Sequence, residues 1–256
     1  MESITEQGHV KTQIENGVGE VCFFHPMSNS MPGKLLRELA AQITAMGNNT
    51  DVKVILLKSE GEKAFCAGAS FDELISIKDL ETGTYFFSGF AAVINAIRKA
   101  PKFVLARVQG KAVGGGVGLA SAADYTFAHE SASVKLSELA VGIGPFVVGP
   151  AVERKVGKSA FVHMTINATE WMTAEWAREK GLYTEIYSSH SDMDVAIKKL
   201  TTTLSSSNPE AMAMLKKVFW EGTENWDQLL TERAGMSGKL VLSDFTVNAI
   251  NKFKSK

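Results

Sequence analysis

The sequence predicts an α/β protein whose chain ends in a helical region. Short runs rich in β-branched and aromatic residues alternate with helical patterns over residues 9 to 130, and the strand signal fades after about residue 140. Strands separated by helices of this length usually pair in parallel. We therefore expect an α/β core over residues 1–195 and a C-terminal helical oligomerisation region over residues 196–256, because the last helix is too poor in apolar residues to stand alone.

Three strands are predicted at 18–24, 52–58 and 102–108, each rich in Val, Ile, Leu or Phe and flanked by turn residues. The helix after the first strand is predicted from one apolar stripe, with Ser30 as a candidate N-cap and Pro32 in the first turn. The stripe consists of Leu35, Leu39, Ile43 and Met46.

Further helices are expected wherever apolar residues recur at helical spacing. One lies between the second and third strands, on Tyr85, Phe86, Phe90, Val93, Ile94 and Ile97. Later ones are expected at 161–166 and 173–180, on the stripe Val195, Ile197, Leu200 and Leu204, and after Asn208-Pro209.

Composition excludes several classes of protein. The 256 residues are 45% hydrophobic, enough for a sizeable core, and the net charge of -1 argues against a nucleic-acid partner. Cys22 and Cys66 are too far apart in sequence for a Cys-x-x-Cys pair, which favours a reducing compartment. The polar N-terminus and the lack of any apolar run of about 18 residues predict a cytoplasmic protein that does not enter a membrane.

Common catalytic signatures fail on inspection. The glycine cluster at 114–119 lacks the last glycine of a dinucleotide-binding loop, and residues 68–72 lack the closing glycine of a nucleophile elbow. The five histidines are scattered without the spacing of metal ligands. We therefore expect neither a metal nor a nucleotide cofactor.

Two turns built from small residues follow equivalent strands. Residues 64–70 follow the second predicted strand and residues 110–116 follow the third, and each leads into a helical pattern. Such turns leave backbone N–H groups exposed at the start of a helix. Two of them side by side would form an oxyanion hole.

These turns resemble those of the crotonase, or enoyl-CoA hydratase/isomerase, superfamily. AFCAGA at 64–69 is similar to its first oxyanion turn and VQGKAVGGGVGLA at 108–120 to its second. The resemblance continues through 122–124, 137–142 and 156–158 to Asn208-Pro209 and the terminal helix. It implies a spiral of ββα units, a C-terminal region for trimerisation, a homotrimer or dimer of trimers, and an acyl-CoA substrate with no separate cofactor.

The resemblance also implies the catalytic residues. The backbone N–H groups of Ala69 and Gly115 would hold the thioester oxygen, and Glu138 would act as general acid or base. We expect burial among neighbouring apolar residues to raise the pKa of Glu138. Those neighbours are Leu136, Leu139, Val141 and Ile143.

One departure from the family pattern bears on the reaction. Typical hydratases carry a second glutamate where this chain has Gly118, so Glu138 acts alone either in hydration or in a single-base reaction. The pattern at 145–157, with G-G-G-x-G-L and S-E-x-x-x-G, is similar to the methylglutaconyl-CoA hydratase-like branch, which favours hydration of a 2-enoyl-CoA. The alternatives are an enoyl-CoA isomerase, an acyl-CoA decarboxylase, or a non-catalytic paralogue that binds acyl-CoA.

The resemblance further implies residues that contact the substrate. Backbone around residues 28–30 and 67–69 would contact the adenine and pantetheine of CoA, and Lys252 or Lys256 would reach its phosphates. Candidate walls of the acyl pocket are Phe87, Phe146 and Val147. The remaining expected substrate-binding residues are Ser28, Asn29, Ser30, Ala67, Gly68, Gly114 and Gly118.

Overall fold

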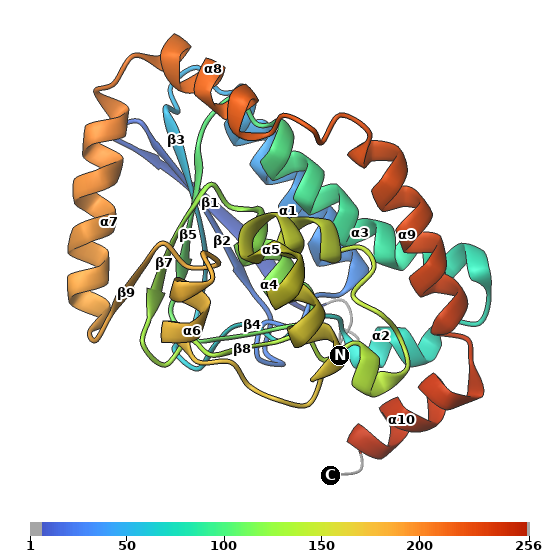
Figure 1. Ribbon diagram of the computed structural model, residues 1–256. Coiled ribbons are helices and arrows are strands. Elements are labelled where there is room, and N and C mark those ends of the chain that lie inside the picture. Colours follow the sequence, from blue (N-terminus) through green and yellow to red (C-terminus); the bar gives the residue numbers. More distant parts are fainter. Residues whose placement is uncertain (1–6, 255–256) are drawn as a thin grey trace.

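A six-stranded sheet forms the centre of the protein (Figure 1). The computed structural model describes residues 7–254, and the strand order is β1-β2-β3-β5-β7-β9. The bounds are His9–Glu15, Val18–Phe24, Val54–Ser59, Val104–Val108, Tyr125–His129 and Glu185–Tyr187. Only the β1–β2 pair is antiparallel, so the predicted parallel α/β core is confirmed.

A second, smaller sheet carries the loops that matter for function. It consists of β4 (Ala64–Cys66), β6 (Lys111–Val113) and β8 (Val134–Lys135), which pair in parallel in the order β4-β6-β8. The sequence analysis interpreted the first two segments as turns, because two or three residues are too few to show a strand period. This pairing places the two small-residue turns side by side.

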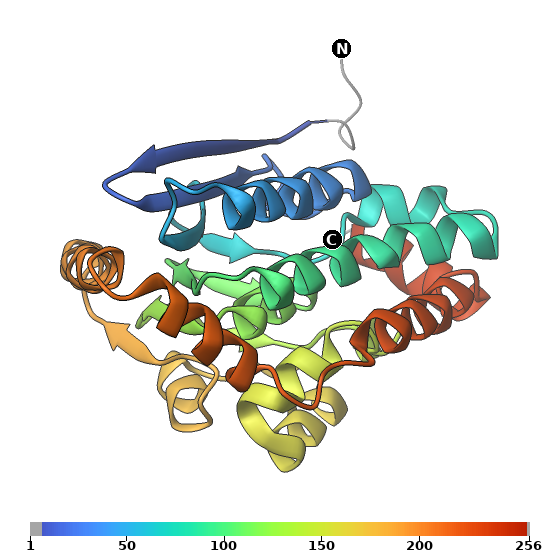
Figure 2. The same cartoon turned by 90° about the horizontal axis from the view of Figure 1, so that it is seen from above.

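Helices cover both faces of the large sheet. Figure 1 shows the sheet between α7 (His190–Ser205) on one side and α1 (Gly33–Asn48), α3 (Leu80–Lys99) and α9 (Trp226–Leu240) on the other. Figure 2 shows α9 alongside α3. The two helices approach closely at a pair of glycines, since a Cβ on Gly83 would lie 2.8 Å from the carbonyl oxygen of Gly238.

The start of α1 differs from the prediction. Its apolar stripe is buried as expected, but the helix begins at Gly33 with Pro32 as the N-cap residue, so Ser30 does not cap it. The carboxylate of Glu73 accepts the Gly33 N–H at 2.7 Å and takes over that role. The hydroxyl of Ser30 instead lies 3.2 Å from Nδ1 of His25.

The stripe predicted on α7 is also corrected at one position. Met193 and Ile197 pack on β-strand residues of the large sheet, whereas the side chain of Val195 is 68% exposed. Residues three or four apart share one face of a helix, whereas residues two apart lie on nearly opposite faces, so Val195 points away from the face of Met193 and Ile197. The predicted domain boundary at residue 195 falls within α7 and stays a prediction.

The remaining helices complete the fold. They are α2 (Phe71–Ser76), α4 (Gly115–Ala122), a short 3₁₀ helix η1 (Leu139–Val141), α5 (Gly149–Ile166), α6 (Ala174–Glu179), α8 (Pro209–Phe219) and α10 (Asp244–Lys254). Helix α10 packs on η1 and α2. Between residues 7 and 254, every helix is too short or too polar to cross a bilayer.

A buried ion pair joins the core to α8. Asp124 follows α4, and its carboxylate accepts hydrogen bonds from Lys216 Nζ at 2.5 Å, Trp220 Nε1 at 2.9 Å and the backbone N–H of Val104 at 2.7 Å. The side chain of Lys216 is only 2% exposed. This network fixes the position of α8 against the sheet.

We expect Asp124→Ala to lower the free energy of unfolding by about 3–5 kcal/mol, because it leaves the ammonium of Lys216 buried without its partner. Urea denaturation of the variant and the wild type measures the difference. Replacing both partners, Asp124→Leu with Lys216→Met, should recover part of the loss. A loss of less than about 1 kcal/mol in Asp124→Ala, which is the contribution of an exposed ion pair, contradicts this account.

Candidate active site

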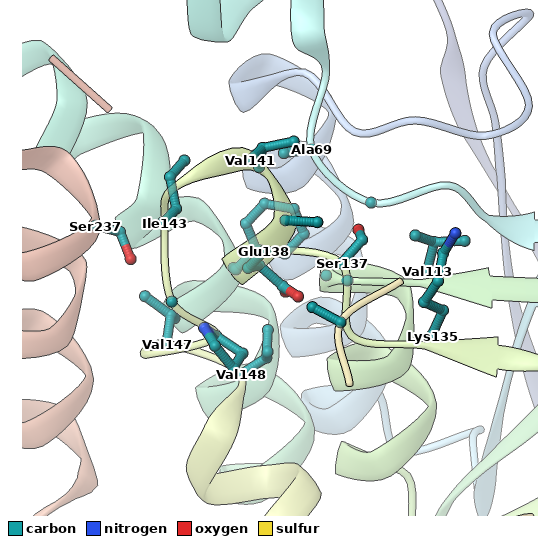
Figure 3. Close-up of a pocket in the computed structure, with 18 of the residues that line it drawn as sticks. Ala69, Val113, Lys135, Ser137, Glu138, Val141, Ile143, Val147, Val148 and Ser237 are labelled. Atoms are coloured by element: carbon teal, nitrogen blue, oxygen red, sulfur yellow. The ribbon is translucent and has the colours of Figure 1, made fainter. Parts of the chain in front are cut away.

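A cavity of about 430 Å³ opens where β4, β6 and β8 end (Figure 3). Most of its walls are apolar, with Phe87 and Phe90 contributed by α3 and Val147 and Val148 by the segment before α5. Among the described residues, the polar or charged lining side chains are Lys135, Ser137, Glu138, Thr169, Trp171 and Ser237. A largely apolar cavity with few polar groups is typical of a small-molecule site.

The first turn requires glycine at its centre. Gly68 has a φ of +88°, and a Cβ there would lie 2.8 Å from the carbonyl oxygen of Val113 in β6. The carbonyl of Gly68 accepts the Met31 N–H at 2.8 Å, which holds the turn against the start of α1. Ala67, Gly68 and Ala69 therefore line the cavity with backbone rather than with side chains.

The second turn is packed more tightly still. Gly114 has a φ of +51° and donates its N–H to the carbonyl of Lys135 at 2.8 Å. A Cβ on Gly115 would lie 2.1 Å from Cε1 of Phe90, and one on Gly116 would lie 2.4 Å from the carbonyl oxygen of Cys66. Contacts with α3 and β4 thus exclude any side chain at positions 115 and 116.

Two backbone donors face the same space. Within residues 7–254, neither the Ala69 N–H nor the Gly115 N–H donates a hydrogen bond to another protein group. Both residues line the cavity, and the Gly115 nitrogen lies 3.4 Å from the position of a Cβ on Gly68. Unpaired N–H groups that converge in this way can stabilise negative charge on one oxygen atom.

Glu138 lies across the second turn from these donors. It follows β8, and Oε1 lies 3.1 Å from the position of a Cβ on Gly114. Oε2 is buried and has no hydrogen-bond partner among the described residues. Desolvation by burial raises the pKa of Glu138 to about 7.

The apolar wall around Glu138 differs in part from the expected one. Val141 and Ile143 line the cavity as expected. Leu136 is buried but lies behind the cavity surface, and Leu139 is 49% exposed on the outside of η1. Val147 and Val148 add to the apolar lining of the cavity.

We expect kcat/KM to rise with pH and to level off above about 7, because Glu138 must be ionised to accept a proton. Stability should change in the opposite direction. Between 4.5 and about 7 the unfolded carboxyl loses its proton while the buried one keeps it, so the free energy of unfolding falls as pH rises. Urea denaturation over this pH range should show a smaller fall in the free energy of unfolding for Glu138→Gln than for the wild type. A wild-type kcat/KM that does not change with pH contradicts the assignment of Glu138 as the base.

Gly118 does not leave a gap opposite Glu138. It is buried in α4, and a Cβ there would lie 2.4 Å from Cγ1 of Val148, which fills the space and lines the cavity. Gly118 therefore lies behind the cavity surface and cannot contact a substrate there. An apolar side chain faces Glu138 instead of a second carboxylate.

Three residues expected to contact CoA lie outside the lining of this cavity, and their contact with CoA stays a prediction. The side chain of Asn29 accepts the His25 N–H and donates to the carbonyls of Glu60 and Ala64. The carbonyl of Ser28 accepts the Ala67 N–H at 3.2 Å, so Ser28 supports the first turn from behind. Ser28, Asn29 and Ser30 do not line the cavity.

Other residues expected to contact substrate line the cavity. The members of this group that line the cavity are Ala67, Gly68, Gly114, Phe87, Phe146 and Val147. Lys252 is exposed on α10, and Lys256 lies outside the described residues.

Four of the polar or charged lining residues were missed by the sequence analysis. Lys135 stands three positions before Glu138, just outside the quoted segment 137–142, and its charge in an apolar run was a usable signal. Thr169, Trp171 and Ser237 come from a loop and from α9, far away in sequence. No pattern in the sequence marks them.

Comparison with known proteins decides the family. The family model described as "Enoyl-CoA hydratase/isomerase" matches residues 13–251, nearly the whole chain. The chain belongs to the enoyl-CoA hydratase/isomerase family. The crystal structure of enoyl-CoA hydratase from Bacillus halodurans superimposes on this family member with a TM-score of 0.87 at 22% identity, covering 95% of this chain and 99% of that one, and confirms the crotonase-like fold.

Two relatives of this enoyl-CoA hydratase/isomerase family member carry more specific names. The human mitochondrial methylglutaconyl-CoA hydratase is 30% identical over 200 residues, which cover 77% of this chain but only 58% of the human protein. The bacillaene synthase dehydratase PksH of Bacillus subtilis is 28% identical over 220 residues, covering 85% of this chain and 82% of PksH. The resemblance to the methylglutaconyl-CoA hydratase-like branch is thus confirmed.

Proposed function

We propose that this family member adds water reversibly to the double bond of a 2-enoyl-CoA, including a branched one such as methylglutaconyl-CoA. The observation that carries the proposal is the carboxylate of Glu138, with a pKa of about 7, beside two unpaired backbone N–H groups in an apolar cavity. The names of the two relatives, a hydratase and a dehydratase, describe the two directions of such a reaction.

The proposed chemistry needs one base and one oxyanion hole. With the thioester oxygen held by the N–H groups of Ala69 and Gly115, the ionised Glu138 accepts a proton from water as its oxygen attacks C3. The electrons of the double bond move onto the thioester oxygen, where the two donors stabilise the enolate. Glu138 then gives the proton to C2, which completes the hydration.

The site also favours a second candidate, double-bond isomerisation. Val148 occupies the place in which typical hydratases carry a second carboxylate. Its side chain is apolar and cannot hold the water by a hydrogen bond. In an isomerase Glu138 would take a proton from C2 of a 3-enoyl-CoA and return it at C4. The same oxyanion hole would stabilise the dienolate.

An assay with three thioesters distinguishes these activities. Hydration predicts loss of the absorbance of the conjugated enoyl group with crotonyl-CoA or 3-methylglutaconyl-CoA. Isomerisation predicts a gain of that absorbance with a 3-enoyl-CoA. Binding of acyl-CoA without turnover or exchange of the C2 proton would identify a non-catalytic paralogue and contradict both proposals.

We propose in addition that the protein is a homotrimer or a dimer of trimers, as the family resemblance implies. Helix α8 carries an apolar surface formed by Met214, Leu215, Val218 and Phe219, whose exposed fractions range from 46% to 62%. A cluster of this kind is typical of a surface that another protein covers. Light scattering of the purified protein should give the mass of three or six chains, and a monomer would contradict this proposal.

A further inference from the structure

Two lysines meet a tryptophan at one end of the cavity. Lys111 begins β6 and Lys135 ends β8. Val113 is the register partner of Lys135, and residues two apart on a strand point to the same face, so both lysines lie on the cavity face of the small sheet. Their ammonium nitrogens lie 4.9 Å and 4.4 Å from the centroid of the Trp171 ring.

The position of Trp171 is fixed by backbone hydrogen bonds. Its neighbour Met172 forms an isolated antiparallel bridge with Val134, and each donates its N–H to the other at 2.9 Å. Trp171 and Lys135 line the same cavity as Glu138. β8 and this bridge therefore place the charge of Lys135 in the lining of the cavity, and Lys111, which is exposed and outside the lining, adds a second charge beside the same ring.

The charge of this cluster is not balanced within the protein. In the part of the chain that the structure describes, neither Lys111 nor Lys135 forms an ion pair with a carboxylate. Two ammonium groups close to the same ring repel each other. A bound anion would relieve this repulsion, and lysine donates hydrogen bonds well to carboxylate oxygens.

The place of the cluster indicates which part of a substrate would supply the anion. Figure 3 shows Lys135 on one side of Glu138, with Ser137 and Val113, whereas Ile143, Val147 and Ser237 lie on the other. The carbonyl of Lys135 accepts the N–H of Gly114, the residue before the proposed donor Gly115. Lys135 lines the same cavity as Ala69 and Gly115. The phosphates of CoA are separated from its sulfur by the whole pantetheine arm, so an anion bound inside this cavity together with the thioester belongs to the acyl group.

We propose that Lys135, with Lys111 and Trp171 beside it, binds a carboxylate at the far end of the acyl group. The preferred substrates are then thioesters of short unsaturated dicarboxylic acids rather than of neutral fatty acids. The proposal rests on the proposed function for the placement of the thioester. Glutaconyl thioesters, with or without a methyl branch, have this chemistry.

The test compares a carboxylated and a neutral substrate in Lys135→Met, which keeps an unbranched side chain of similar size and removes its charge. We expect kcat/KM for 3-methylglutaconyl-CoA to fall by about 10- to 100-fold, mainly through KM, because a charged hydrogen bond is lost. The value for crotonyl-CoA should stay within about twofold of the wild type. Lys135→Arg should retain most of the activity toward the carboxylated substrate.

Lys198→Met is the matched control, since Lys198 is exposed on α7 on the far side of the large sheet and should change neither value. If the lysines bind the phosphates of CoA instead, Lys135→Met lowers kcat/KM equally for both substrates. Such an equal loss overturns the proposal, and so does unchanged activity toward both.

A binding experiment keeps this inference separate from the proposed reaction. Glutaryl-CoA and butyryl-CoA have no double bond, so calorimetry with the wild-type protein measures their affinities whether or not the protein is a hydratase. We expect the wild type to bind glutaryl-CoA at least about 10-fold more tightly than butyryl-CoA. Lys135→Met should bind the two with equal affinity. Equal affinities in the wild type overturn the carboxylate subsite, whereas tighter glutaryl-CoA binding without any turnover overturns only the proposed function.

Discussion

Replacing Glu138 by Gln should lower kcat by about 10²- to 10⁴-fold, the contribution of a positioned general acid or base. The amide has nearly the shape of the carboxyl group but cannot accept the proton. Oε2 has no protein partner within residues 7–254, so the change breaks no hydrogen bond of that atom. Steady-state kinetics on the preferred 2-enoyl-CoA measure the effect, and calorimetry with a saturated acyl-CoA should show nearly unchanged affinity.

Glu130→Gln is the matched control, because Glu130 is exposed after β7 and outside the cavity. It should have the kcat of the wild type. Near-normal turnover by Glu138→Gln would contradict the role of Glu138 in either reaction. Loss of acyl-CoA binding together with turnover would instead assign Glu138 to the binding of substrate.

Adding one methyl group to the second turn, in Gly115→Ala, should lower kcat nearly as much. In Gly115→Ala the new Cβ would lie 2.1 Å from Cε1 of Phe90, so either the turn or α3 must move. Displacing one oxyanion donor costs about 10²- to 10³-fold in kcat. The crowding should also lower the free energy of unfolding by about 1–3 kcal/mol.

A second substitution separates this clash from a general effect of alanine. Phe90→Leu removes the ring edge that meets the methyl group, so the double variant should recover part of the lost kcat. Gly235→Ala in α9 is the matched control, because a Cβ there has no atom within 4 Å and alanine favours a helix. Full activity of Gly115→Ala, or no recovery in the double variant, would contradict the proposed position of the donor.

The parts of the fold that follow a local period were predictable from the sequence. The stripe on α1 and the strands β2, β3 and β5 lie close to where they were predicted, although β3 and β5 begin two residues later. Helix α1 and β2 bury one face, whereas β3 and β5 are buried on both faces and so consist almost entirely of apolar residues. The small sheet was not recognised, since its strands are two or three residues long and are stabilised by pairing with each other. Short pairings of this kind depend on contacts that are distant in sequence.

The site was predictable where it is made of backbone and less so where it is made of side chains. Glycine at 114–116 marked the second turn, because tight packing against α3 and β4 leaves no room for a Cβ. That Val148 fills the space beside Gly118 was not predictable, since the two residues belong to different elements. The placement of Trp171 beside Lys135 likewise depends on the Val134–Met172 bridge.

The central claim is that Glu138 moves a proton between water and C2 of an enoyl thioester held by Ala69 and Gly115. Its most direct test is incubation of the preferred 2-enoyl-CoA with the protein in D₂O, followed by mass spectrometry and NMR of the product. The account predicts a 3-hydroxyacyl-CoA with one deuterium at C2 from the wild type, and almost none from Glu138→Gln. Unchanged substrate without deuterium, or equal product from both proteins, would contradict it.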